Sequence, residues 1–199
     1  MLATQNPIEQ DGTYPLPEAQ MDRFMFKLQM SFPAERELCD IVLMTQDSQA
    51  EQAERVMSGG DLIAMRETAR EIPVLEEVLQ YAVRLVSATH PELANAPETT
   101  RKELRFGASP RAAQALITAA RIRALTQGRY NVAYEDINAL ACPVLRHRVK
   151  LTYEAVMARR TPDDVILSLL GELNGVSRRR PRSAPEGVER GRRRPWASV

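Results

Sequence analysis

The stretch from Leu2 to Lys27 constrains the fold most, because prolines and a change of periodicity divide it into short, distinct elements. Its start predicts the end of a strand that stops after Asn6, since Pro7 cannot donate a hydrogen bond to a sheet. A polar loop follows, and proline near a helix start favours a short helix over Pro17–Asp22. From Phe24 to Met30 apolar residues then alternate with other residues, which predicts a second strand.

Two polar side chains of this stretch are candidate ligand contacts. Strand ends of open α/β sheets are common ligand sites, so the amide of Asn6 can orient a water or a phosphate oxygen there. Arg23 follows the predicted helix and can bind a phosphate on a neighbouring molecule, because a guanidinium offers two parallel hydrogen bonds. The simpler alternative is that Asn6 only ends a strand and that Arg23 pairs with Asp22 or Glu18 on a solvated face.

The composition indicates one soluble domain or two small ones. The 199 residues are 44% hydrophobic, 27% charged and only 5% aromatic, so aliphatic residues must form the core. No apolar run approaches the roughly 20 residues of a membrane span, and the first residues lack a signal-peptide pattern, so we expect a cytoplasmic protein. Cys39 and Cys142 lie far apart among apolar neighbours, so we expect small buried hydrophobes, with no disulfide and no metal site.

Helical periodicity dominates the rest of the chain, so the predicted fold class is mainly α. Caps, breakers and apolar spacing predict helices over Glu35–Met44, Asp61–Glu71, Pro73 to about His90, Pro110–Gln127, Tyr134–Ala141 before Pro143, and Val165–Leu170. From the second of these helices, Leu62, Met65 and Ala69 are expected to face inward. The non-helical segments are predicted as a loop over Asn95–Lys102, an extended piece over Leu104–Phe106, and a disordered Arg-, Pro- and Gly-rich tail from residue 175.

The run Ser109-Pro110-Arg111 is the second candidate site. Serine is a favourable N-cap and proline a favourable first helical residue, which places Arg111 in the first turn. A cation there opposes the helix dipole at a cost of about 0.3–1 kcal/mol, so stability alone would favour Asp or Glu. An arginine beside the free N–H groups of a helix start does make an anion site. The alternative is that Arg111 extends into water or pairs locally.

The stretch Leu2–Lys27 closely resembles the MoxR family of AAA+ ATPases, and further runs extend the resemblance to about Leu170. The resemblance implies that Asn6 is the sensor-1 residue, which positions the water that attacks the γ-phosphate. It implies that Arg23, in Glu-Ala-Gln-Met-Asp-Arg-Phe, is the arginine finger that reaches the ATP of the next subunit. It also implies that Arg111, in Gly-Ala-Ser-Pro-Arg-Ala, is the sensor-2 arginine and contacts nucleotide phosphates.

The run Val144–Arg148 resembles the family as well, and its basic side chains can face phosphate or a neighbouring subunit, although a solvated face is the reading that we favour. Members of the family use ATP and magnesium and assemble as rings, often hexameric. They act as chaperone-like machines that mature or activate protein complexes, often with von Willebrand factor A partners. The resemblance implies a homo-oligomeric ring and such a partner for this chain too.

The 199 residues contain no Gly-x-x-x-x-Gly-Lys-Ser/Thr phosphate loop and no apolar strand that ends in Asp-Glu for magnesium. The resemblance thus covers a C-terminal portion: the end of an AAA+ α/β core over 1–33, a connecting helix and linker over 34–60 that ends at Gly59-Gly60, an all-helical lid over 61–174, and the tail over 175–199. A shortened gene, a split gene and a stand-alone product all fit this pattern.

We expect the chain alone to hydrolyse no ATP, because the phosphate loop is missing from it. Two other classes of function stay open. One is a non-catalytic lid module that binds intact ATPase subunits. The other is a nucleic-acid binder that uses the Arg-rich tail, although the arginines there lack the interleaved aromatics of many such segments.

Overall fold

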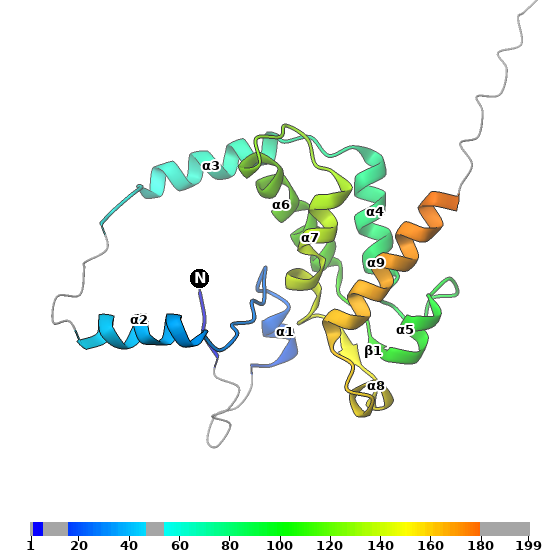
Figure 1. Ribbon diagram of the computed structural model, residues 1–199. Coiled ribbons are helices and arrows are strands. Elements are labelled where there is room, and N and C mark those ends of the chain that lie inside the picture. Colours follow the sequence, from blue (N-terminus) through cyan, green and yellow to red (C-terminus); the bar gives the residue numbers. More distant parts are fainter. Residues whose placement is uncertain (1, 6–15, 47–53, 180–199) are drawn as a thin grey trace, which may run out of the picture.

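Helices make up nearly all the regular structure in the computed structural model, which describes residues 2–5, 16–46 and 54–179 (Figure 1). The elements are α1 (Glu18–Met21), α2 (Glu35–Gln46), α3 (Gly59–Glu71), α4 (Glu76–Ser87), α5 (Glu98–Glu103), β1 (Leu104–Phe106), α6 (Pro110–Thr126), α7 (Tyr134–Leu145), β2 (Lys150–Leu151), α8 (Tyr153–Met157) and α9 (Pro162–Arg179). The fold is therefore mainly α, as predicted, and the described residues form one small two-stranded sheet.

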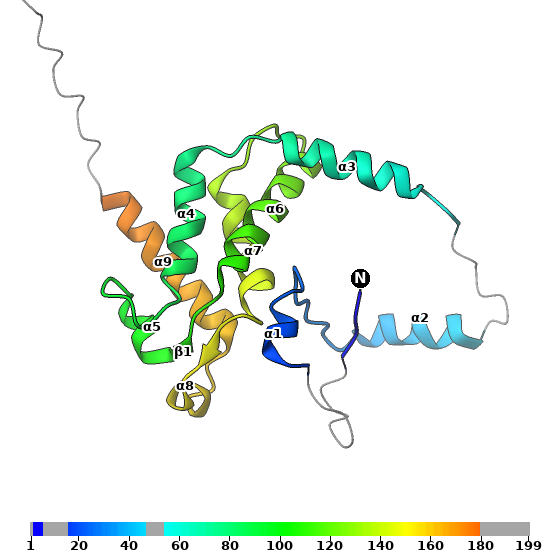
Figure 2. The ribbon, with the colours of Figure 1, turned by 180° about the vertical axis from the view of Figure 1, so that it is seen from behind.

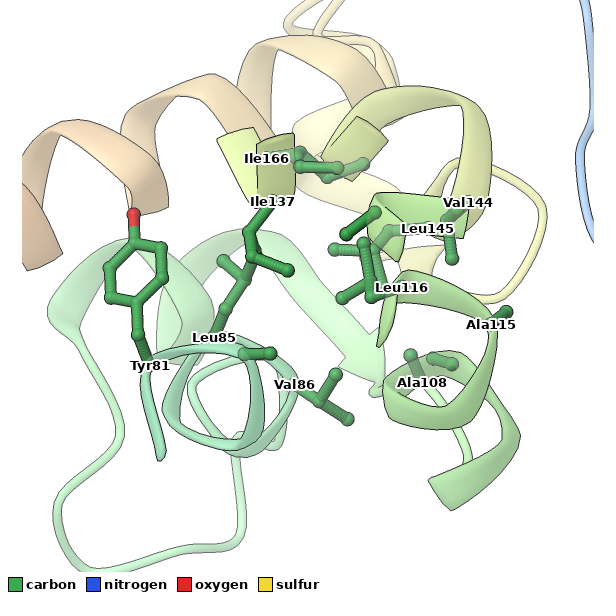
Figure 3. Close-up of a cluster of buried hydrophobic side chains, with 14 of the residues drawn as sticks. Tyr81, Leu85, Val86, Ala108, Ala115, Leu116, Ile137, Val144, Leu145 and Ile166 are labelled. Atoms are coloured by element: carbon green, nitrogen blue, oxygen red, sulfur yellow. The ribbon is translucent and has the colours of Figure 1, made fainter. Parts of the chain in front are cut away.

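The hydrophobic core lies among α4, α6, α7 and α9, whose apolar side chains meet in Figure 3. Alanines of α6 allow close packing, and Ala112, Ala120 and Ala124 are fully buried. Within these four helices, the largest apolar side chains that are less than 2% exposed are Leu85, Leu116, Ile137, Val144, Leu145, Val165, Ile166 and Leu169. On α4, Val78 and Val86 are buried in this core, whereas Leu79 and Val83 face outward.

The short sheet closes one end of this helix group. β1 pairs antiparallel with β2, with Leu104 opposite Leu151, which confirms the extended piece that the sequence predicts. The segment before β1 is a short helix, α5, rather than the expected loop. Thr100 is fully buried in α5 and its hydroxyl donates to the Ala88 carbonyl, so one tertiary contact orders a polar segment that has no apolar periodicity.

Helices α2 and α3 reach away from the core helices in both views (Figures 1 and 2). No residue of α2 is buried, and Cys39 is exposed, so its predicted burial is wrong. Helix α3 contacts α6 and buries Ala69, but Leu62 and Met65 are 56% and 55% exposed instead of facing inward. Among the described residues, α3 has a packing partner along its last turns only, which leaves its first turns uncovered.

The strand predicted over Phe24–Met30 is wrong, because residues 24–34 form no regular element. The apolar alternation is not matched by burial, since Leu28 and Met30 are 71% and 92% exposed. A strand needs a neighbouring strand to receive its backbone hydrogen bonds, and the described residues place none here. The first carbonyls of this segment accept hydrogen bonds from side chains after α7 instead.

Several helix limits also differ from the prediction. Helix α7 continues through Pro143, because burial of Val144 and Leu145 offsets the roughly 3 kcal/mol cost of an interior proline. Helix α3 begins at Gly59, since Ser58 and Asp61 form a capping box in front of it. Helix α9 starts at Pro162, where the Thr161 hydroxyl accepts a hydrogen bond from the Asp164 amide, and it runs on to residue 179, into the segment expected to be a disordered tail. Residues 180–199 lie outside the described part.

Candidate functional site

The loop that leads into α6 is fixed against the end of α4. A side chain at Gly107 would place its Cβ 2.7 Å from the Thr89 carbonyl oxygen and 2.8 Å from the His90 ring, so this approach requires glycine. The Thr89 hydroxyl accepts a hydrogen bond from the Ala108 amide at 3.0 Å, and His90 Nε2 donates to the Ala108 carbonyl at 2.9 Å. The start of α6, and with it Arg111, is therefore held in one position.

Ser109 is the N-cap residue of α6 with Pro110 after it, as predicted, but its side chain does not cap the helix. The Ser109 hydroxyl lies 2.8 and 2.9 Å from the two carboxylate oxygens of Asp22, which directly follows α1. Arg111 donates from Nη1 to Asp22 Oδ2 at 3.1 Å and leaves 58% of its side chain exposed. The partner of Arg111 is thus a carboxylate distant in sequence, and the first N–H groups of α6 carry no side-chain cap.

The carboxylate of Asp22 accepts hydrogen bonds from three side chains. In addition to Ser109 and Arg111, it accepts a hydrogen bond from Arg148 Nε at 3.1 Å. Partial burial works to raise the pKa of Asp22, but the hydrogen bonds from Ser109 and Arg111 and the charge of Arg148 outweigh it and hold this pKa below its usual value. Asp22 is therefore a carboxylate at neutral pH and offsets part of the positive charge around it.

Arg148 is enclosed, with only 2% of its side chain exposed, and all five of its N–H groups have acceptors. Nε donates to the Asp22 carboxylate, and Nη2 donates to the carbonyls of Asp22 and Phe24 at 3.0 and 2.6 Å. Nη1 donates to the carbonyls of Met25, at 3.3 Å, and Val144. The expected solvated face over Val144–Arg148 is wrong for this arginine, because protein acceptors replace water around the whole guanidinium.

The two residues before Arg148 extend this contact. Arg146 donates from Nη1 to the Lys27 carbonyl at 3.2 Å, and His147 Nε2 donates to the Phe24 carbonyl at 3.1 Å. Because Nε2 must carry the proton in that bond, Nδ1 of the neutral ring is a buried acceptor with no partner among the described residues. Burial and the neighbouring charge of Arg148 lower the pKa of His147, so the ring is neutral at pH 7.

An open pocket of about 220 Å³ lies over this cluster. Arg23, Arg111, Asp22 and Arg148 all line it, and α6 contributes Gln114 and other residues. Arg23 and Arg111 bring two exposed guanidinium groups to this pocket, beside the start of α6, which has no side-chain cap, whereas Arg148 is occupied by Asp22 and by backbone carbonyls. The pocket therefore favours an anion with several oxygens, such as a phosphate group.

Arg23 makes no ion pair with any other described residue. Asp22 is engaged by Arg111 and Arg148, and the carboxylate of Glu18 lies 2.8 Å from the Lys150 amine. The alternative in which Arg23 pairs with Asp22 or Glu18 is therefore wrong for this structure. Asn6 lies outside the described residues, so the structure brings together two of the three site residues that the sequence predicts.

Sequence reasoning missed Arg148 as a site residue and treated Asp22 only as a local partner. Both had a signal, since Asp22 directly precedes Arg23 in the same motif and Arg148 ends the basic run that resembles the family. What the sequence could not show is that 126 positions of chain separate two halves of one ion pair. Within the described residues, no helix has the length and apolarity to cross a membrane, and no group of His, Cys, Asp and Glu side chains gathers as a metal site would need.

Comparisons with known families agree with this geometry. A family profile described as "AAA lid domain" matches residues 97–169, which carry α6, α7 and most of the core. A second one, "ATPase family associated with various cellular activities (AAA)", matches residues 1–26, which end just after Arg23. Together with the fold and the arginine-lined pocket, these matches define the class as the lid and adjoining core edge of an AAA+ ATPase.

Individual relatives narrow the class. The chain is 40% identical over 170 residues to Chaperone MoxR1 of Mycobacterium tuberculosis, which covers 85% of this chain and 45% of that relative. It is 30% identical over 176 residues to Protein MoxR of Methylorubrum extorquens, which covers 82% of this chain and 51% of the relative. The chain belongs to the MoxR family of AAA+ ATPases. It corresponds to a C-terminal portion of the family's members.

A solved structure supports the same assignment. The crystal structure of a candidate ATPase from Cytophaga hutchinsonii superposes with a TM-score of 0.76 at 32% identity, over 84% of this chain and 51% of that chain. The chain therefore spans about half the length of the relatives and the solved structure that it matches.

Proposed function

We propose that this chain supplies the lid and the arginine-bearing edge of a MoxR-type AAA+ ATPase, a chaperone-like ring machine. Such a machine couples ATP binding and hydrolysis to the maturation or activation of protein complexes. The observation that carries the proposal is that Arg23 and Arg111 line one open pocket, in which Asp22 pairs with both Arg111 and Arg148. Phosphate is the ligand that this arrangement fits best, because each exposed guanidinium can bind two phosphate oxygens.

The proposed roles are those that the family resemblance implies, and the shared pocket of Arg23 and Arg111 supports two of them. Arg23 acts as the arginine finger on the γ-phosphate held by a neighbouring subunit, and Arg111 acts as the sensor-2 arginine. Because both line the same pocket of one chain, we infer that both contact the same nucleotide, so Arg111 also acts across the subunit boundary. Asn6 is proposed to orient the attacking water as sensor 1. ATP and magnesium are the proposed cofactors, bound by phosphate-loop and acidic residues that these 199 do not include.

The proposal implies an oligomer, since a finger acting on a neighbour's ATP requires a subunit interface. A homo-oligomeric ring is the proposed assembly, a von Willebrand factor A domain protein is a proposed partner, and the cytoplasm is the proposed location. No phosphate loop is present in this sequence, so the isolated chain is expected to release no phosphate from ATP above a blank.

The experiment uses a fusion that joins the N-terminal half of a relative such as Chaperone MoxR1 to this chain. Arg23→Ala should leave ATP affinity nearly unchanged and lower turnover by about 10³–10⁵-fold, the range for arginine fingers. Arg23→Lys should restore little, because lysine keeps the charge but loses the planar fork. Arg105→Ala, at an exposed arginine in β1, is the matched control and should leave turnover unchanged.

A mixing test separates action across an interface from action within one subunit. Rings that mix Arg23→Ala subunits with subunits lacking the phosphate-loop lysine should regain turnover, because some sites then contain both parts. Confirmed mixed rings without any regained turnover would contradict the proposed role of Arg23. If the chain binds intact ATPase subunits and suppresses their turnover instead, the non-catalytic lid module is the better reading.

A further inference from the structure

Arg23 lies on a segment that has little regular structure of its own. The single turn α1 ends at Met21, and the backbone from Phe24 onward belongs to no helix or strand. None of residues 16–46 is buried, so apolar packing does not fix the direction of the Arg23 side chain. An arginine finger must nevertheless hold its guanidinium in one place, since misplacement by about 1 Å can cost roughly 10²-fold in rate. Another part of the molecule must supply that order.

The hydrogen bonds that hold the backbone around Arg23 in place come from Arg148. Its guanidinium donates to the backbone carbonyls of Asp22, Phe24 and Met25, which flank Arg23 on both sides. A fourth carbonyl, that of Val144, ties the same guanidinium to the end of α7, and the Asp22 carboxylate takes the fifth N–H. Arg148 thus attaches the backbone around Arg23 to the lid without a hydrogen bond to the Arg23 side chain itself.

Only arginine can make this set of bonds. A guanidinium presents five N–H groups in one plane, whereas a lysine ammonium presents three from a single atom and cannot reach acceptors spread around a plane. The pocket-facing arginines are exposed, but Arg148 is 2% exposed and has no donor left for a phosphate. Its chemistry therefore suits a structural anchor rather than a ligand contact.

The same carboxylate extends the anchor to the second pocket arginine. Asp22 accepts from Arg148 on one oxygen and from Arg111 on the other, and Ser109 donates to both. The position of Arg23 relative to Arg111 is therefore set by the ion pair between Asp22 and the buried Arg148.

We propose that Arg148, through Asp22 and the carbonyls around Arg23, is the positioning residue that fixes the finger relative to the sensor-2 arginine, so that the two move with the lid as one body. The finger role itself rests on the proposed function, whereas the anchoring can be measured on this chain alone.

The first test is hydrogen exchange of the 199-residue chain followed by mass spectrometry. Arg148→Lys and Arg148→Gln should raise amide exchange at least tenfold in peptides covering residues 22–27, including the Lys27 amide that donates to Pro143 at 2.9 Å. Peptides of α4 and α6 should be unchanged. Arg160→Lys is the matched control, because it weakens another lid arginine, paired with Glu103 at 3.0 Å, that does not contact this segment.

If the Arg148 variants lose helical circular dichroism, Asp22→Asn replaces them. This variant removes the negative charge of Asp22, the less buried partner of Arg148, and keeps the size of its side chain. Unchanged exchange at 22–27 in a folded variant would overturn the anchor, whatever the ATPase measurements give.

The second test measures turnover in the fusion described above. Arg148→Lys should lower kcat by about 10–100-fold while the KM for ATP changes less than about threefold, because positioning is lost and binding is not. The double variant Arg148→Lys/Arg23→Ala should be no slower than Arg23→Ala, since an anchor has nothing left to position once the finger is absent. Arg160→Lys should match the unmodified fusion.

The outcomes of this test separate the two ideas. Additive losses in the double variant, or an unchanged kcat in Arg148→Lys when Arg23→Ala is slow, would overturn the positioning role. An unchanged kcat in Arg23→Ala would instead overturn the finger role in the proposed function, while the exchange experiment would still decide whether Arg148 is an anchor.

Discussion

The lid and the segment that carries Arg23 are held in place by different forces. Helices α4, α6, α7 and α9 bury a continuous set of aliphatic side chains, whereas none of residues 16–46 is buried. That segment is attached through hydrogen bonds and ion pairs to Arg148 and its two predecessors. Apolar burial is strong but has little directional preference, and hydrogen bonds to one guanidinium are strongly directional. Apolar burial thus supplies most of the stability of the lid, whereas the hydrogen bonds to Arg148 set the orientation of the segment beside it.

The largest expected effect comes from opening the lid core. Leu116 is fully buried at the centre of the side chains drawn in Figure 3, so Leu116→Ala should lower the free energy of unfolding by about 2–5 kcal/mol. Leu43→Ala removes the same atoms from α2, where the side chain is 66% exposed, and should cost less than about 0.5 kcal/mol. Urea unfolding followed by circular dichroism measures both. Equal losses would show that α2 has a buried partner in solution and would remove the contrast between the two regions.

A smaller loss is expected where the two regions meet, at the loop before α6. Gly107→Ala would place a methyl group 2.7 Å from the Thr89 carbonyl, so the loop must shift, at a cost of about 1–3 kcal/mol. The shift displaces Ser109 and Arg111 from Asp22, so exchange at residues 22–27 should rise together with the loss of stability. Gly60→Ala, whose Cβ would meet only Ser58 at 3.5 Å, is the control and should be close to neutral. If amide exchange at residues 22–27 stays unchanged in Gly107→Ala, the loop before α6 does not contribute to holding the segment around Arg23.

Local sequence signals predicted the lid well and the polar contact poorly. The Ser109-Pro110 start of α6 and the cap of α9 depend on residues a few positions apart, so the sequence shows them directly. Arg23 and Arg111 were found through family motifs, and the structure brings them to one pocket. The strand at Phe24–Met30 failed because alternation alone does not provide a neighbouring strand.

The anchor escaped prediction for a different reason. Whether an arginine is solvated or buried depends on which carbonyls surround it after folding, and those of residues 22–25 come from the other end of the described chain. Burial of polar groups is a property of tertiary contacts, so no local pattern around Arg148 could distinguish a surface cation from an internal one.

The polar contact, unlike the lid core, should respond to mildly acidic pH. The pKa of His147 in the folded chain is below its ordinary value of 6.5, so its contribution is complete above about pH 6.5 and is lost as pH falls from there toward the folded pKa. Protonation would place a buried N–H without an acceptor beside Arg148 and Lys27, with only Asp22 to offset the charge. Exchange at residues 22–27 should therefore rise several-fold between pH 7 and pH 5, after correction for intrinsic rates.

Two comparisons check that His147 is responsible. His147→Gln keeps a donor for the Phe24 carbonyl but does not titrate, so the rise between pH 7 and pH 5 should disappear in this variant. The carboxylate of Asp22 also has a lowered folded pKa, but its contribution is lost only below its ordinary value of 3.8, which lies outside this window. A rise that persists in His147→Gln would assign the pH response to another group.

The smallest expected effect tests whether the segment is attached by general charge attraction or by directed bonds. Lys150 lies two positions after Arg148 and also reaches the segment, with its Nζ 2.8 Å from Glu18 Oε1, but the two side chains are 41% and 67% exposed. Water solvates both ions in the separated state, so Lys150→Ala should weaken the attachment by no more than about 1 kcal/mol, and added salt should screen even that. The measurement is exchange of residues 18–27 at low and at high salt, with Arg148→Lys alongside. The Arg148 effect should persist in salt because its bonds are shielded from solvent and directed at fixed carbonyls. If Lys150→Ala released the segment as completely as Arg148→Lys, general attraction to positive charge would hold the segment. Directed hydrogen bonds would then not fix the orientation of Arg23.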